Sequence, residues 1–196
     1  MKKITFIIAL TGFVFITSCK NDNKTKKTET EEVTIQEADS DEGTEEGELV
    51  FFKLEAKSNS NVTGNITFKE HDNKVTMIAV INGLNEGEHA IHIHESSDCS
   101  SDDGKSSGGH WNPTAQPHGQ WGSENGYHKG DIGNFTANAE GKGSISVTTD
   151  EWCIGCGDDT KDILGKAIIV HEGVDDLESQ PSGAAGARVS CGGIIQ

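Results

Sequence analysis

The chain has 196 residues, of which 33% are hydrophobic and 24 are glycine. This composition disfavours a helical bundle and favours one domain with many turns. The 16 basic and 32 acidic residues give a formal charge of -16, which repels nucleic acid and anionic lipid headgroups. We therefore expect no nucleic-acid partner.

The N-terminal segment has the parts of a secretory signal. Met1-Lys2-Lys3 is basic, an apolar run covers residues 4–16, and small residues precede Cys19. The apolar run is shorter than the roughly 20 residues that span a bilayer. A cysteine directly after Ile-Thr-Ser resembles the lipobox of bacterial lipoproteins. We predict a signal peptide over 1–18 and lipidation of Cys19, with ordinary signal cleavage nearby as the alternative.

The segment 19–48 is acidic and nearly free of large apolar residues. Residues 20–48 contain four lysines and eleven acidic residues, so their net charge is 4 − 11 = −7. Such a segment cannot bury enough surface to offset the entropy cost of ordering, and we predict a disordered tether. The remaining 49–196 contain 10 basic and 21 acidic residues, a net charge of −11.

From Leu49 onward, apolar and polar residues alternate with the period of two that is typical of strands. No segment has a convincing helical stripe. The predicted strands cover 49–56, 62–68, 74–81, 89–94, 132–139, 142–149, 166–171 and 187–191. Short strands with turns between them predict an all-β antiparallel sandwich or barrel. The intervening stretch 96–130 is too long for a passive connection, which indicates a functional loop.

Seven of the eight histidines lie between His89 and His171, a clustering that indicates a metal site. His92 and His94 lie two apart in a predicted strand, so their side chains share a face and can reach one ion. Alone, such a pair is more often plain surface. Three or four nitrogen ligands suit copper, whereas histidines with one carboxylate suit zinc. The six histidines outside His71 and His89, together with Asp131, can build both sites only if one histidine is shared.

Five segments resemble the motifs of copper/zinc superoxide dismutase and occur in that family's order. They are 89–95, 109–113, 128–134, 170–176 and 186–192. The resemblance covers about 49–196 and implies an eight-stranded Greek-key barrel or sandwich of the immunoglobulin-like kind, with long metal-bearing loops. It also implies that copper redox cycling converts superoxide to dioxygen and hydrogen peroxide.

The resemblance implies one copper and one zinc per subunit. The copper ligands would be His92, His94, His110 and His171, and the zinc ligands His110, His118, His128 and Asp131. His110 would be the bridging imidazolate and a catalytic residue. Asp175 would link a copper-ligand histidine to a zinc-ligand histidine and fix their rings.

Arg188 is the only arginine of the chain and occupies the family position beside copper. Its permanently charged donors suit a small anion, so we predict a catalytic role in guiding superoxide to the site. Lys105 and Lys129 are further candidates for attracting the anion. The last two are suggested by charge alone.

Five cysteines are consistent with an exported, oxidising setting. The resemblance implies a disulfide between Cys99 and Cys191. Cys153 and Cys156 do not belong to the general family pattern; a local disulfide, a redox centre and half of a zinc site are the alternatives, of which we favour the local disulfide.

The sequence as a whole indicates a superoxide dismutase anchored by lipid to a bacterial cell envelope, on a periplasmic or outer-membrane face. A lipoprotein that buffers copper or zinc without significant turnover is the second hypothesis. A noncatalytic sandwich used for adhesion is the third. The sequence leaves both a monomer and a homodimer open.

Overall fold

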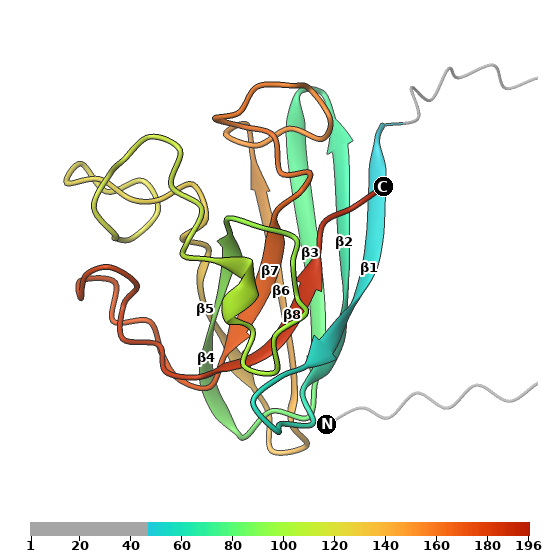
Figure 1. The fold of residues 1–196 in the computed structure, drawn as a ribbon, viewed down its shortest axis with the longest axis vertical. Helices are drawn as coiled ribbons and strands as arrows, with labels where there is room; N and C mark the ends of the chain where they lie inside the picture. Colours follow the sequence, from blue (N-terminus) through green and yellow to red (C-terminus); the bar gives the residue numbers. More distant parts are fainter. Residues whose placement is uncertain (1–46) are drawn as a thin grey trace, which may run out of the picture. The chain divides into compact units, whose positions relative to one another are not determined.

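The computed structural model describes residues 47–196, which form a closed barrel of eight antiparallel strands (Figure 1). The strands are β1 (Leu49–Ala56), β2 (Thr63–His71), β3 (Lys74–Asn82), β4 (Gly87–His94), β5 (Gly133–Ala137), β6 (Lys142–Thr149), β7 (Ala167–His171) and β8 (Arg188–Gly193). Around the barrel they follow the order β1-β2-β3-β6-β5-β4-β7-β8. The crossings from β3 to β4 and from β6 to β7 make the predicted Greek-key arrangement, so the predicted fold class is confirmed.

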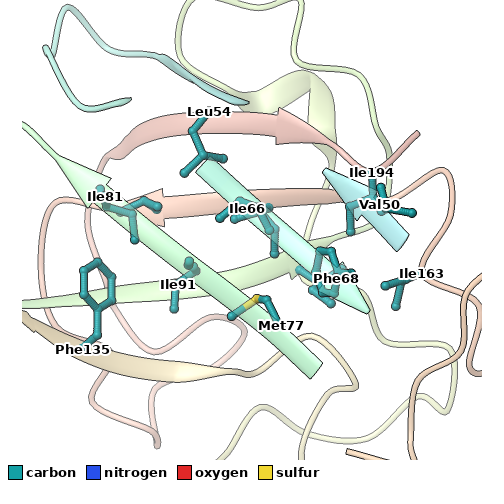
Figure 2. Close-up of a cluster of buried hydrophobic side chains, with 14 of the residues drawn as sticks. Val50, Leu54, Ile66, Phe68, Met77, Ile81, Ile91, Phe135, Ile163 and Ile194 are labelled. Atoms are coloured by element: carbon teal, nitrogen blue, oxygen red, sulfur yellow. The ribbon is translucent and has the colours of Figure 1, made fainter. Parts of the chain in front are cut away.

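The alternation in the sequence places every second side chain of β2 and β3 inside the barrel, because successive strand residues point to opposite faces. Ile66 and Phe68 of β2 and Met77 and Ile81 of β3 are fully buried. Each such side chain contributes about 1.5–3 kcal/mol by leaving water. Figure 2 shows these side chains meeting those of the neighbouring strands in one interior cluster.

β4, β7 and β8 are buried along both faces over most of their length, unlike the other strands. Two long segments, 95–132 and 172–187, bond to the backbone beside them: Ile93 N donates to Gly130 O, and Ala90 N donates to Gly173 O. In Figure 1 these segments lie on the side of the barrel that carries β4, away from β2. Polar side chains on the outward face of β4 are therefore enclosed between the sheet and the loops.

The predicted strands match those observed to within a few residues at each end. The largest difference is at β2, which continues to His71, three residues beyond its predicted end. One short 3-10 helix, η1 (Lys105–Ser107), lies in the long loop after β4.

The predicted signal peptide, Cys19 and nearly all of the predicted tether lie outside the described residues. Within 47–196, no helix is long and apolar enough to cross a membrane.

Candidate metal centre

Two neighbouring strands supply three of the histidines. His92 and His94 alternate with the core residues Ile91 and Ile93 on β4, so both imidazoles point outward beneath the loops and are almost fully buried. His171 is the last residue of β7, the strand that pairs with β4. The three rings therefore gather on one outer patch of the barrel.

The loop between β4 and β5 supplies the other three histidines. His110 is held beside His94 by an isolated β-bridge, and the ring centroids of His110 and His92 are 4.0 Å apart. His118 and His128 follow on the same loop, and Asp131 lies just before β5. All are buried.

The structure brings the predicted residues together in two groups that share His110. Within each group, one potential ligand atom per residue lies within 4.8 Å of those of the others. One group consists of His92, His94, His110 and His171, and the other of His110, His118, His128 and Asp131. A four-nitrogen group beside a three-nitrogen, one-carboxylate group is the pair of donor sets expected for copper and zinc.

Each of the six histidines has one buried ring nitrogen without a well-aligned hydrogen bond among the described residues, although two of these atoms lie 3.0 and 3.1 Å from the Asp131 carboxylate. The six nitrogens are Nδ1 of His92, His118 and His128, and Nε2 of His94, His110 and His171. Burying so many polar atoms without well-aligned hydrogen bonds costs free energy unless something else binds them. Because all six converge on the two groups, the donors fit two metal ions.

The opposite ring nitrogen is held by the protein in most of these histidines. His94 Nδ1 lies 3.0 Å from Gly108 O, and His171 Nδ1 lies 3.3 Å from Gly186 O. His92 Nε2 and His118 Nε2 lie 2.8 and 2.9 Å from the two carboxylate oxygens of Asp175. Such contacts fix each ring and select which nitrogen faces the metal.

Asp131 is the centre of the second group. Its carboxylate oxygens lie 2.8 Å from His110 Nδ1, 3.0 Å from His118 Nδ1 and 3.1 Å from His128 Nδ1. Burial raises the pKa of Asp131, but the contacts with the three histidines outweigh it and hold that pKa far below its ordinary value. The carboxylate is therefore ionised and available as a ligand.

His118 differs in charge from three other histidines of the site. Burial lowers the pKa of His94 well below its ordinary value, that of His110 to about 4 and that of His171 to about 3. Burial acts in the same sense on His118, but hydrogen bonds with Asp131 and Asp175 outweigh it and raise its pKa to about 9. At neutral pH the first three rings are neutral, whereas His118 must lose a proton before its Nδ1 can bind a metal.

A pocket of about 700 Å³ opens beside the first group and is lined by His94, His110, His171 and Arg188. Arg188 Nη1 donates to Gly104 O at 2.9 Å and to Ser107 Oγ at 3.2 Å, which fixes the guanidinium. Burial lowers the pKa of Arg188, yet a guanidinium stays charged in proteins. This places a fixed cation at the mouth of the site.

The two lysines suggested by charge have different positions. Lys105 lines the pocket but pairs with Asp103, its Nζ lying 2.9 Å from the carboxylate. Lys129 is absent from the pocket lining and pairs with Glu151 instead. Its role as a helper in attracting superoxide stays a prediction.

Both predicted cysteine pairs are bonded in the structure. The Cys99–Cys191 disulfide joins the loop that carries η1 to β8, over a sequence separation of 92. The Cys153–Cys156 disulfide closes a local loop between β6 and β7. Of the three alternatives for the second pair, the structure supports the local disulfide.

Several residues that support the site were not identified from the sequence. Asn134 pairs with the backbone of Asp175, donating to its O and accepting from its N, both at 2.8 Å. Gln180 pairs in the same way with the backbone of His118. Gly183 has a left-handed φ of 66°, and a Cβ there would overlap the Asp175 carboxylate. The partners of these residues are distant in the chain, so no local sequence pattern indicates their role.

A sequence model of the copper/zinc superoxide dismutases (SODC) matches residues 62–194. The chain belongs to the copper/zinc superoxide dismutase family. Its reaction is the dismutation of superoxide to dioxygen and hydrogen peroxide, and its metals are copper and zinc. The resemblance seen in the sequence is confirmed.

Relatives of this superoxide dismutase occur in distant organisms. A copper/zinc superoxide dismutase of Dictyostelium discoideum is 40% identical over 139 residues, which cover 67% of this chain and 88% of the relative. An extracellular copper/zinc superoxide dismutase of Drosophila melanogaster is 39% identical over 145 residues, 69% of this chain and 77% of the relative. Among solved structures, a SOD-like protein from Bacillus subtilis is 31% identical with a TM-score of 0.66, covering 74% of this chain and 97% of its own.

Proposed function

We propose that His92, His94, His110 and His171 hold the copper, and that His110, His118, His128 and Asp131 hold the zinc. The observation that carries this proposal is the convergence of six buried histidine nitrogens, none with a well-aligned hydrogen bond to the described residues, on two groups with one shared ring. Bound copper supplies the one-electron redox chemistry for superoxide, and bound zinc supplies charge without redox chemistry.

His110 serves both halves of the site. Its Nδ1 faces Asp131 in the zinc group, and its Nε2 faces the copper group beside the pocket. Because burial lowers its pKa to about 4, the ring is neutral at pH 7 and carries one proton. With Nδ1 bound to zinc, that proton would lie at Nε2 whenever Nε2 is not bound to copper. Nε2 is therefore the atom from which this chain can give a proton to the reduced substrate.

Arg188 attracts and orients superoxide. The domain carries a net charge of −11 over 49–196 and repels an anion at long range, so a local cation must dominate at the pocket. The hydrogen bonds to Gly104 and Ser107 use Nη1, and Nη2 makes no hydrogen bond to the described residues. That nitrogen can donate to a diatomic anion in the pocket.

Asp175 positions one histidine of each half. Its two oxygens hold Nε2 of His92 and Nε2 of His118, which leaves Nδ1 of both rings for the metals. Hydrogen bonds with both histidines lower the pKa of Asp175 against the effect of burial. The ionised carboxylate therefore couples the orientation of the copper-side ring to that of the zinc-side ring.

We also propose that the protein is exported and anchored to a bacterial cell envelope through lipid on Cys19, with 19–48 as its tether and 49–196 as the enzyme domain. The N-terminal pattern of residues supports the anchor. Two disulfides and the extracellular relatives support export. The anchor places the protein on a periplasmic or an outer-membrane face, as a monomer or a homodimer. Sedimentation of the purified protein distinguishes the monomer from the homodimer.

Metal analysis of single-ligand variants tests the assignment. His171→Ala should lose copper and keep zinc, whereas His128→Ala should lose zinc and keep copper. Loss of both metals from both variants, or of neither, would contradict two separate sites.

The lipid anchor is tested by membrane fractionation of bacteria that express the full chain or its Cys19→Ser variant. The full chain should be found in the membrane and the variant should not. Equal partition of the two proteins would contradict lipidation.

A further inference from the structure

The segment between β6 and β7, residues 150–164, has no part in the two ligand groups. It contains the Cys153–Cys156 disulfide and is attached to the barrel at two points. Trp152 is buried and packs edge-on against Phe68 of β2, with ring centroids 6.0 Å apart, and Ile154 N donates to the Glu70 carboxylate at 2.8 Å. This attachment makes the segment a rigid extension of the barrel.

Two consecutive residues of this segment contact the loop that carries the zinc-side histidines. The Glu151 carboxylate accepts from Tyr127 OH and from Lys129 Nζ, both at 2.5 Å. Trp152 Nε1 donates to Lys129 O at 3.0 Å. Tyr127 and Lys129 are the two chain neighbours of His128, so the segment holds the side chain of the residue before that histidine and both the side chain and the backbone of the residue after it.

His128 has little other support from outside its own loop. Its ring Nδ1 lies 3.1 Å from Asp131, and its backbone N donates to the same carboxylate at 2.8 Å. Asp131 is itself a proposed ligand only three residues away. By contrast, His118 is held by Asp175 at its ring and by Gln180 at its backbone.

We propose that Glu151 and Trp152 are positioning residues for His128, and that the disulfide-containing segment 150–164 transmits the rigidity of the barrel to the zinc half of the site. The inference rests on the proposed zinc site and extends it. Neither residue lines the pocket or contacts a copper-side histidine. Their removal should therefore weaken metal binding in the zinc half and leave the copper half unchanged.

The test compares Glu151→Gln and Trp152→Phe with the control Asp150→Asn in the chain from Cys19, with Cys19→Ser to prevent lipidation. Glu151→Gln and Asp150→Asn remove the same charge at adjacent positions, but the Asp150 side chain makes no hydrogen bond to Tyr127 or Lys129. Trp152→Phe keeps an aromatic ring and removes the Nε1 donor. Metal-free protein is titrated with Co²⁺, whose visible absorption reports the geometry of a four-coordinate site, and then loaded with copper for electron paramagnetic resonance.

We expect Co²⁺ to bind about tenfold more weakly to Glu151→Gln and Trp152→Phe, with altered absorption bands, because partners beyond the ligands typically change metal affinity by about 10–100-fold. Asp150→Asn should match the wild type, and the copper spectrum should be the same in all four proteins. Equal Co²⁺ affinity throughout would overturn the inference, as would a copper spectrum that changes along with the cobalt one. If Glu151→Gln does not fold by circular dichroism, Lys129→Met replaces it and is read in the same way. A wild type that binds no Co²⁺ would instead overturn the proposed zinc site itself.

Discussion

Removing the Cys99–Cys191 disulfide should cost this superoxide dismutase a large part of its stability. The bond closes a chain loop with a sequence separation of 92, for which the chain-entropy relation gives about 4–5 kcal/mol at 25 °C. Alanine is the better replacement, because Cys191 is fully buried beside Ala167 and Ile169, where a serine hydroxyl would be costly to bury. We expect Cys99→Ala/Cys191→Ala to lower the free energy of unfolding of the metal-free protein by about 3–5 kcal/mol.

Urea denaturation followed by tryptophan fluorescence measures this loss. Cys153→Ala/Cys156→Ala is the matched control, since its bond spans a sequence separation of only 3 and the same relation gives about 2 kcal/mol. If the two double variants lost equal stability, or the first lost less than about 1 kcal/mol, the argument from chain entropy would be refuted. Activity should also fall in the first, because Arg188 Nη1 bonds to Gly104 on the loop that Cys99 anchors.

Three further predictions concern the site. Arg188→Ala should retain both metals, but its turnover should fall about tenfold or more and lose much of its dependence on salt. Stopped-flow kinetics at several ionic strengths measures this, and an unchanged salt dependence would contradict steering by Arg188. Because the pKa of His118 is about 9 in the metal-free protein, a metal that binds at Nδ1 displaces one proton. The affinity for Co²⁺ should therefore rise about tenfold per pH unit between pH 7 and 8. An affinity that does not change with pH would contradict the raised pKa. Gly183→Ala should weaken zinc binding about tenfold or more and copper binding less, because a Cβ there overlaps Asp175 Oδ1, which holds His118, whereas Oδ2 holds His92. Metal analysis after dialysis against a chelator measures both losses, and zinc retention equal to that of the wild type would contradict the prediction.

The sequence predicts the barrel well because strand alternation is a local signal. Where one face is buried and the other exposed, as in β3, polar and apolar residues alternate directly in the sequence. The end of β2 is predicted least well, because Lys69, Glu70 and His71 break the alternation and yet pair with β3. Pairing with a neighbouring strand extends β2 where the hydrophobic pattern has already ended.

The sequence predicts which residues form the site but not which ring nitrogen each histidine presents to it. Motifs name His92 and His94 as a pair, yet the structure presents Nδ1 of the first and Nε2 of the second. The difference arises because Asp175 occupies Nε2 of His92, whereas the carbonyl of Gly108 occupies Nδ1 of His94. Glu151 lies outside the motifs because its partners Tyr127 and Lys129 are 24 and 22 residues away in the chain.

The measurement that tests the account most directly is superoxide dismutation as a function of copper occupancy. The chain from Cys19, carrying Cys19→Ser, is loaded with one zinc per chain and increasing copper, and the decay of superoxide is followed after pulse radiolysis. The rate of superoxide decay should rise in proportion to bound copper, approach the diffusion limit per copper, and be negligible without copper. Full occupancy of both sites with no turnover would contradict this account and would favour a metal-buffering protein.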